Sequence, residues 1–242
     1  MKQPRSVWPI VVAATLGILI LCGLGAWQLQ RLAQKQELLA EFDRRAGADA
    51  VGLSEAKKRQ ESGENVEFLK VSVTGRFLHD AEKYMIGVFD GNPAWEVVTP
   101  LVTADNTLIL VDRGLVPDEK RNPATRPEDN PVGSVAITGI LRLHPNGRGP
   151  FSPDNDIKAN MWFWWDVPAM LDATPAPGAK SAPFVLHMIP VAGQKNFPRP
   201  AALRAAIPNN HLQYAITWFA LALVLAAIAG LFIRGHIKKS GA

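Results

Sequence analysis

The chain has 242 residues, of which 48% are hydrophobic, and a formal net charge of +4. This length corresponds to one or two domains. The positive charge lies at the ends, where Lys2 and Arg5 precede the first apolar stretch and Arg234, Lys238 and Lys239 follow the last. The middle section therefore carries −1. The positive net charge is thus no evidence for nucleic-acid binding, which needs basic residues clustered on a folded face, and we expect no nucleic-acid partner.

The first element in chain order is an apolar helix. No charged residue occurs from Val7 to Ala26, and about 20 helical residues span a hydrocarbon core of about 30 Å. We therefore predict a transmembrane helix over residues 7–28. We expect it to be retained, because the apolar run is longer than that of a signal peptide and lacks a small-x-small cleavage site. The only cysteine, Cys22, lies in it, so we expect no disulfide or C-x-x-C copper site elsewhere.

A helical extension and linker is expected over residues 29–66, because Leu29, Leu32, Gln36 and Leu39 recur at helical spacing. From residue 67 the hydrophobic period changes to two. The alternation predicts strands over 67–77, 83–88, 94–102, 107–113, 133–143 and 182–191. Turn residues separate these strands at hairpin spacing. Residues 67–208 are therefore predicted to form a mainly antiparallel β domain, either a sheet or a partly closed barrel.

Two segments of this domain are candidate contact surfaces. The proline-rich stretch 114–131 predicts a long exposed loop, and such loops often carry a contact. Residues 160–166 contain Trp162, Phe163, Trp164 and Trp165. Four large aromatic side chains in succession cannot all face one core, so we expect part of this segment to meet lipid, a ligand or a partner.

A second uncharged stretch, from Leu212 to Ile233, predicts a transmembrane helix over residues 210–233, followed by a basic tail over 234–242. Basic tails at both ends place both termini in the cytoplasm and the β domain outside it. No transit segment rich in arginine and serine precedes the first helix. The simplest location is a bacterial inner membrane, with the β domain in the periplasm.

Four of the five histidines give no sign of a metal site. His79, His144 and His187 have no second ligand at a metal-binding spacing, and His236 lies in the basic tail. His187 and Met188 resemble a soft ligand pair for copper, but adjacent strand residues point to opposite faces. We therefore expect no metal site in the β domain. No hydrolase or phosphate-binding signature is present, and we expect no enzyme activity.

His211 is different, because it lies at the mouth of the second helix, where ionisable residues are usually functional. Tyr214 and Trp218 share a helix face with it, and a neutral imidazole beside apolar groups suits an axial haem ligand. Trp27 and Arg31 end the first helix at the same interface. They could form the other wall of a pocket, with Arg31 pairing with a haem propionate. The alternative is an interfacial belt of amphipathic side chains with no ligand.

The order of these features resembles the surfeit locus protein 1 family, the biogenesis factors of haem–copper terminal oxidases. The resemblance covers most of the chain, and Leu115 replaces a tryptophan that is frequent in the family. Its most specific segments are Gly25-Ala-Trp-Gln-Leu-Gln-Arg31, Arg113-Gly-Leu-Val-Pro117, Asn160-Met-Trp-Phe-Trp-Trp-Asp166 and Asn209-Asn-His-Leu-Gln-Tyr-Ala-Ile-Thr-Trp218.

The resemblance implies two membrane helices around an outer domain and a role in assembling the oxidase. It also implies binding of haem a, received from haem a synthase and delivered to oxidase subunit I, with His211 as the axial ligand of the haem iron. We expect Tyr214, Trp218, Trp27 and Arg31 to complete the haem site. The alternative is a scaffold that holds oxidase assembly intermediates through the 114–131 loop and the aromatic segment and binds no haem.

Overall fold

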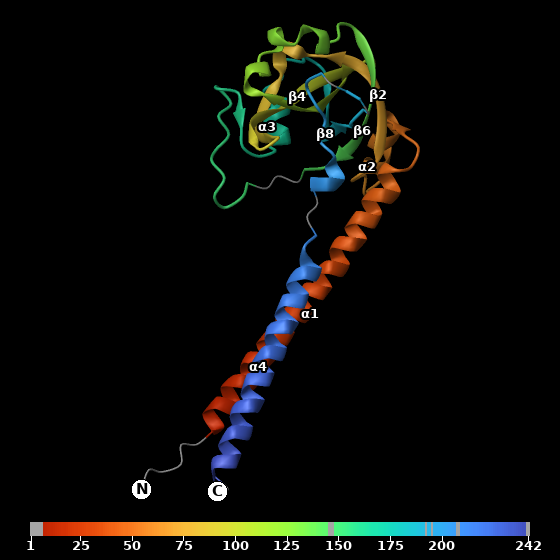
Figure 1. The fold of residues 1–242 in the computed structure, drawn as a ribbon. Helices are drawn as coiled ribbons and strands as arrows, with labels where there is room; N and C mark the ends of the chain where they lie inside the picture. The colour runs from red at the N-terminus through yellow and green to blue at the C-terminus, as the bar shows by residue number, and fades with distance from the viewer. Residues whose placement is uncertain (1–6, 145–147, 192, 195, 207–208, 241–242) are drawn as a thin grey trace. The chain divides into compact units, whose positions relative to one another are not determined.

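The structure is a computed structural model that describes residues 7–144, 148–191, 193–194, 196–206 and 209–240 (Figure 1). The chain forms two compact units. One contains the terminal helices, up to Ala40 and from Ala205 onward, and the other is a β unit from Glu41 to Arg204. Some residues named above lie outside the described part of the chain: Lys2, Arg5, and the side chains of Lys238 and Lys239.

In the helical unit, α1 runs without a break from Trp8 to Ala46, and α4 runs from His211 to Ser240. Both are long and apolar enough to cross a membrane, which confirms the prediction of two such helices flanking a β domain. The 39 residues of α1 correspond to about 58 Å at 1.5 Å per residue. This length exceeds the hydrocarbon thickness of about 30 Å. The helix therefore extends beyond the membrane-spanning segment expected to end at residue 28, as the predicted helical extension requires.

Small residues bring α1 and α4 together. A Cβ atom at Gly25 would lie 2.7 Å from the ring of Phe219, and one at Gly17 would lie 2.9 Å from Leu225. The buried residues of α4 in the apolar segment are also small: Ala215 and Ala222. Helix pairs in membranes depend on such close approach, because lipid gives them no hydrophobic drive to associate. The two helices therefore form a packed pair.

The β unit contains the strands β1 (Val51–Gly52), β2 (Lys70–Phe77), β3 (Lys83–Phe89), β4 (Asn92–Thr103), β5 (Thr107–Pro117), β6 (Ser134–Arg142), β7 (Met161–Trp162) and β8 (Lys180–Met188). Its short helices are α2 (Leu53–Glu61) and α3 (Val167–Asp172). Turns of 3-10 helix occur at His79–Ala81, Asp118–Lys120, Pro123–Thr125, Pro127–Asp129 and Leu203–Ala206.

Five of these strands form a barrel. They are hydrogen-bonded in the order β2, β6, β8, β5 and β4, and β4 pairs again with β2 to close the ring. Closure requires a glycine at residue 75, because a Cβ atom there would lie 2.6 Å from the carbonyl oxygen of Val102. Most pairings are antiparallel as predicted, but β5 and β8 are parallel. Parallel neighbours need a long crossover, and residues 118–179 provide it.

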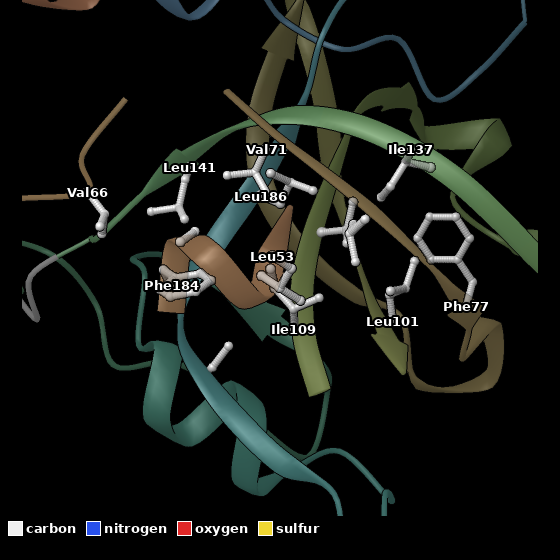
Figure 2. Close-up of a cluster of buried hydrophobic side chains, with 14 residues drawn as sticks. Leu53, Val66, Val71, Phe77, Leu101, Ile109, Ile137, Leu141, Phe184 and Leu186 are labelled. Atoms are coloured by element: carbon white, nitrogen blue, oxygen red, sulfur yellow. The ribbon is translucent and has the colours of Figure 1, made fainter. Parts of the chain in front are cut away.

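The barrel is filled by the side chains that alternate inward along its strands (Figure 2). Val71, Ile109 and Leu186 come from three different strands and are almost fully buried. Leu53 of α2 and Val66 belong to the same cluster. We expected residues 51–66 to lie in the helical extension and linker. They also contribute side chains to the core of the barrel.

The predicted exposed loop at 114–131 is more ordered than expected. β5 continues to Pro117, and three short 3-10 helices follow. Arg126 from this segment is buried and forms an ion pair with Glu82. The prediction of a long exposed loop is therefore wrong for residues 114–117, which belong to β5, and for Arg126, which is buried. The reason is that a buried carboxylate needs a cationic partner, which anchors the segment to the barrel.

The aromatic segment divides its side chains between different surroundings. Trp162 is almost fully buried and belongs to a second core cluster with Met170 and Val185. Trp165 packs against the same cluster, and its ring also stacks on His144, with centroids 4.3 Å apart. Phe163 and Trp164 are half-buried and belong to neither core cluster, so the four aromatic side chains do not all face one core. A contact of this segment with lipid, a ligand or a partner stays a prediction.

Candidate functional site

A polar contact links the two membrane-type helices where α4 begins. Nδ1 of His211, the first residue of α4, lies 2.8 Å from Oε1 of Gln28 in α1. Gln28 is only 9% exposed, although it follows a long apolar run. A polar side chain between apolar helices is stabilised when it finds a partner across the interface. The pair therefore fixes the orientation of the imidazole.

This hydrogen bond also selects the tautomer of His211. Oε1 of Gln28 can only accept, so Nδ1 of His211 carries the proton and donates it. A neutral imidazole then has its lone pair on Nε2. Metal-binding histidines in proteins are typically held in this way, with one ring nitrogen donating to a partner and the other available to the metal.

The predicted site residues lie around this contact in different ways. Tyr214 and Trp218 follow His211 at three and seven residues in α4, and Trp218 is half-buried while Tyr214 is 54% exposed. Trp27 is 51% exposed. Nη1 of Arg31 donates to Oε1 of Gln34 in its own helix, at 3.0 Å. The structure thus joins His211 to α1 through Gln28. Among the described residues, no hydrogen bond or ring contact joins His211 to the other four predicted residues.

Gln28 was missed by the sequence reasoning, although a signal for it exists. It follows Gly25 by three residues, and Gly25 follows Gly17 by eight. These spacings place all three residues on nearly the same helix face. A glycine stripe predicts the face that contacts another helix, and a glutamine on that face predicts a polar contact with the partner.

A second group of ionisable side chains is buried in the β unit and was also missed. Nδ1 of His187 lies 2.6 Å from Oδ2 of Asp112, and Nε2 of His187 lies 2.7 Å from Nε2 of His144. Ligand atoms of Glu96, Asp112 and His187 all lie within 4.8 Å of one another. The sequence spacing of the histidines therefore did not reveal these potential co-ligands of His187. The residues are distant in sequence but adjacent in the barrel, since Asp112 is opposite His187 in the β5–β8 register.

Burial governs the charges in this group. It raises the pKa of Asp112 to about 6 and, together with the charge of Asp112, raises the pKa of Glu96 well above its usual range. Burial also lowers the pKa of His187 to about 4 and that of His144 to about 3. At neutral pH both imidazoles are therefore uncharged, and the two neighbouring carboxyl groups hold one proton between them.

Known proteins match this chain over most of its length. The model of the SURF1 family matches residues 15–223. Surfeit locus protein 1 of Rattus norvegicus is 33% identical over 237 residues, which cover 90% of this chain and 72% of that protein. The Homo sapiens protein of the same name is 34% identical over 236 residues, covering 89% and 74%. A SURF1-like protein of Rickettsia bellii is 30% identical over 236 residues, covering 93% and 90%. The chain therefore belongs to the SURF1 family.

Proposed function

We propose that this protein is an assembly factor for a haem–copper terminal oxidase and that it holds haem a for delivery to oxidase subunit I. In this proposal the haem is cargo, received from haem a synthase in the same membrane. The two apolar helices cross a bacterial inner membrane, with both termini in the cytoplasm and the β unit in the periplasm. The lipid bilayer is then the protein's permanent environment.

The hydrogen bond between His211 and Gln28 is the observation that supports this proposal best. It holds the imidazole in the tautomer whose Nε2 lone pair can bind iron. The remaining residues supply surfaces of suitable chemistry. Trp27 and Tyr214 expose aromatic faces on the two helices, and such faces suit a flat apolar macrocycle. Arg31 adds a guanidinium group that can pair with a propionate.

A carrier must also release its cargo, and the chemistry of this site is consistent with that requirement. His211 is the histidine that we place at the iron, and Gln28 orients it as a neutral partner. A neutral amide polarises an imidazole less than a carboxylate does, which keeps the ligand a moderate electron donor. Aromatic contacts on exposed helix faces add affinity without enclosing the cargo.

The test is purification of the full chain from cells that also express a haem a synthase, followed by haem typing and visible spectroscopy. We expect haem a to copurify with the wild type, and His211→Ala to lose it. Gln28→Leu should keep His211 as the iron ligand but remove the hydrogen bond that orients its imidazole, which should lower haem affinity about 10- to 100-fold. His236→Ala, near the other end of α4, is the matched control and should resemble the wild type.

The scaffold alternative makes the opposite prediction for the same samples. A protein that only holds assembly intermediates would copurify with oxidase subunits but contain no haem a. An unchanged haem content and spectrum in His211→Ala would also contradict the proposed site.

A further inference from the structure

The buried group in the β unit has the composition of a metal site. Glu96 comes from β4, Asp112 from β5 and His187 from β8, and their ligand atoms lie within 4.8 Å of one another. We propose that Glu96, Asp112 and His187 bind a divalent transition-metal ion of the zinc class. This site is separate from His211 and does not depend on the proposed haem function.

Charge is the first argument for this proposal. Asp112 and His187 are almost fully buried, and the carboxyl group of Glu96 lies beside them. Two carboxylates cannot both be ionised in such a place unless a cation compensates them. A proton shared by the pair supplies one charge. A divalent ion supplies two and leaves the group neutral, with both carboxylates as ligands.

The orientation of the ligands is the second argument. Nε2 of His187 faces Nε2 of His144 at 2.7 Å, and Oδ1 of Asp112 accepts a hydrogen bond from the backbone N–H of Gly114 at 2.8 Å. Both ligands are therefore held through the atom that does not face the proposed ion. Partners of this kind orient metal ligands and tune their basicity. On metal binding the proton shared by the two carboxyl groups is released to solvent, and the His187 proton moves from Nδ1 to Nε2. Nε2 of His144 then accepts this proton in a hydrogen bond, so the proton of His144 itself lies on its Nδ1.

The ligand types indicate which ion fits. One imidazole and two carboxylates, with no sulfur among them, are typical of zinc and similar divalent ions and not of monovalent copper. Zinc ligands at about 2.0–2.1 Å in tetrahedral geometry lie about 3.3 Å apart. Nδ1 of His187 and Oδ2 of Asp112 are 2.6 Å apart, so they must separate by several tenths of an ångström. Rotation of the carboxylate side chains can provide this.

A cavity adjoins this group at His144. This cavity of about 420 Å³ in the β unit is lined by His144 and Asp172 among other residues. His144 thus lies between the cavity and His187, which its Nε2 contacts, and Trp165 stacks on its ring. An ion entering through this cavity would pass His144 before it reached the proposed ligands.

The test uses the full chain in detergent, with any affinity tag removed, after treatment with a chelator. Zn²⁺ binding is measured by competition with a chromophoric chelator, and bound metal is counted by mass spectrometry. We expect stoichiometric Zn²⁺ on the wild type and loss of that binding in His187→Gln and Glu96→Gln. His144→Gln should retain the site with about 10- to 100-fold weaker affinity.

The controls separate loss of the site from loss of the fold. Glu96→Gln is isosteric with the protonated acid, so its thermal denaturation without metal should match that of the wild type. Glu128→Gln removes an exposed carboxylate from the same unit and should bind Zn²⁺ normally, as should His211→Ala. A wild type that binds no Zn²⁺, or a Glu96→Gln variant that binds it with unchanged affinity, would show that the group holds only protons.

Discussion

The ion pair between Arg126 and Glu82 should be a principal anchor of residues 118–130 on the barrel. Glu82 and both of its arginine partners are buried. Arg126 forms an ion pair with Glu82 through Nη2 and donates from Nε to the carbonyl oxygen of Lys120 at 3.0 Å. Arg113 lies 3.3 Å from the other carboxylate oxygen. The variant Arg126→Met keeps the apolar stem of the side chain and removes the guanidinium group.

The expected loss of unfolding free energy follows from what Glu82 retains. Removing one partner of a buried ion pair costs about 3–5 kcal/mol, because the other charge stays buried. Here Arg113 still faces the carboxylate, and Thr99 and Tyr84 still donate to it at 3.1 Å. The loss should therefore lie at the lower end, about 3 kcal/mol.

Urea denaturation of the full chain in detergent, followed by tryptophan fluorescence, measures this loss. Arg76→Met is the matched control, because Arg76 is exposed on β2, and it should change stability by less than about 0.5 kcal/mol. If Arg126→Met lowered the free energy of unfolding no more than Arg76→Met does, the ion pair would not be what anchors residues 118–130.

Three further predictions concern other parts of the molecule. The charges and hydrogen-bond donors around Glu82 outweigh its burial and hold its pKa below the ordinary value of 4.5. The stability that the Glu82 carboxylate contributes is therefore present above about pH 4.5 and is lost as pH falls through the lower folded pKa. The unfolding free energies of wild type and Glu82→Gln should therefore converge when both are measured at decreasing pH. Burial lowers the pKa of Lys83 from 10.5 to about 8, which penalises folding by about 3 kcal/mol while the amine is charged. Lys83→Met should thus stabilise the protein at pH 7, and its advantage should shrink between pH 8 and 10.5; an advantage independent of pH would contradict this. Finally, Gly25→Ala should weaken association of the two helices in a membrane assay because it meets Phe219, whereas Gly23→Ala has nothing within 4 Å and should not; equal effects would rule out the packed pair.

The strands were predictable from the sequence because the pleat imposes a period of two and turn residues separate the runs. β2, β3 and β5 begin within three residues of their expected positions. The helices were predictable because a bilayer requires long uncharged segments. These are local patterns, and they depend on neighbouring residues alone.

The parts that the sequence did not reveal depend on pairing between distant segments. Asp112 and His187 lie opposite each other only because β5 and β8 are parallel neighbours in a closed barrel. Arg126 reaches Glu82 across 44 positions of the chain. At the helix pair, His211 was identified by its residue type and position, but its partner Gln28 depends on which faces of α1 and α4 meet.

The haem a content of His211→Ala is the decisive measurement for the proposal that His211 holds haem a. Wild type, His211→Ala and His236→Ala are purified in parallel from cells that make haem a, and haem a per chain is measured by extraction. We expect wild type and His236→Ala to carry haem a and His211→Ala to carry none. Equal haem a in all three samples, or none in the wild type, would contradict it.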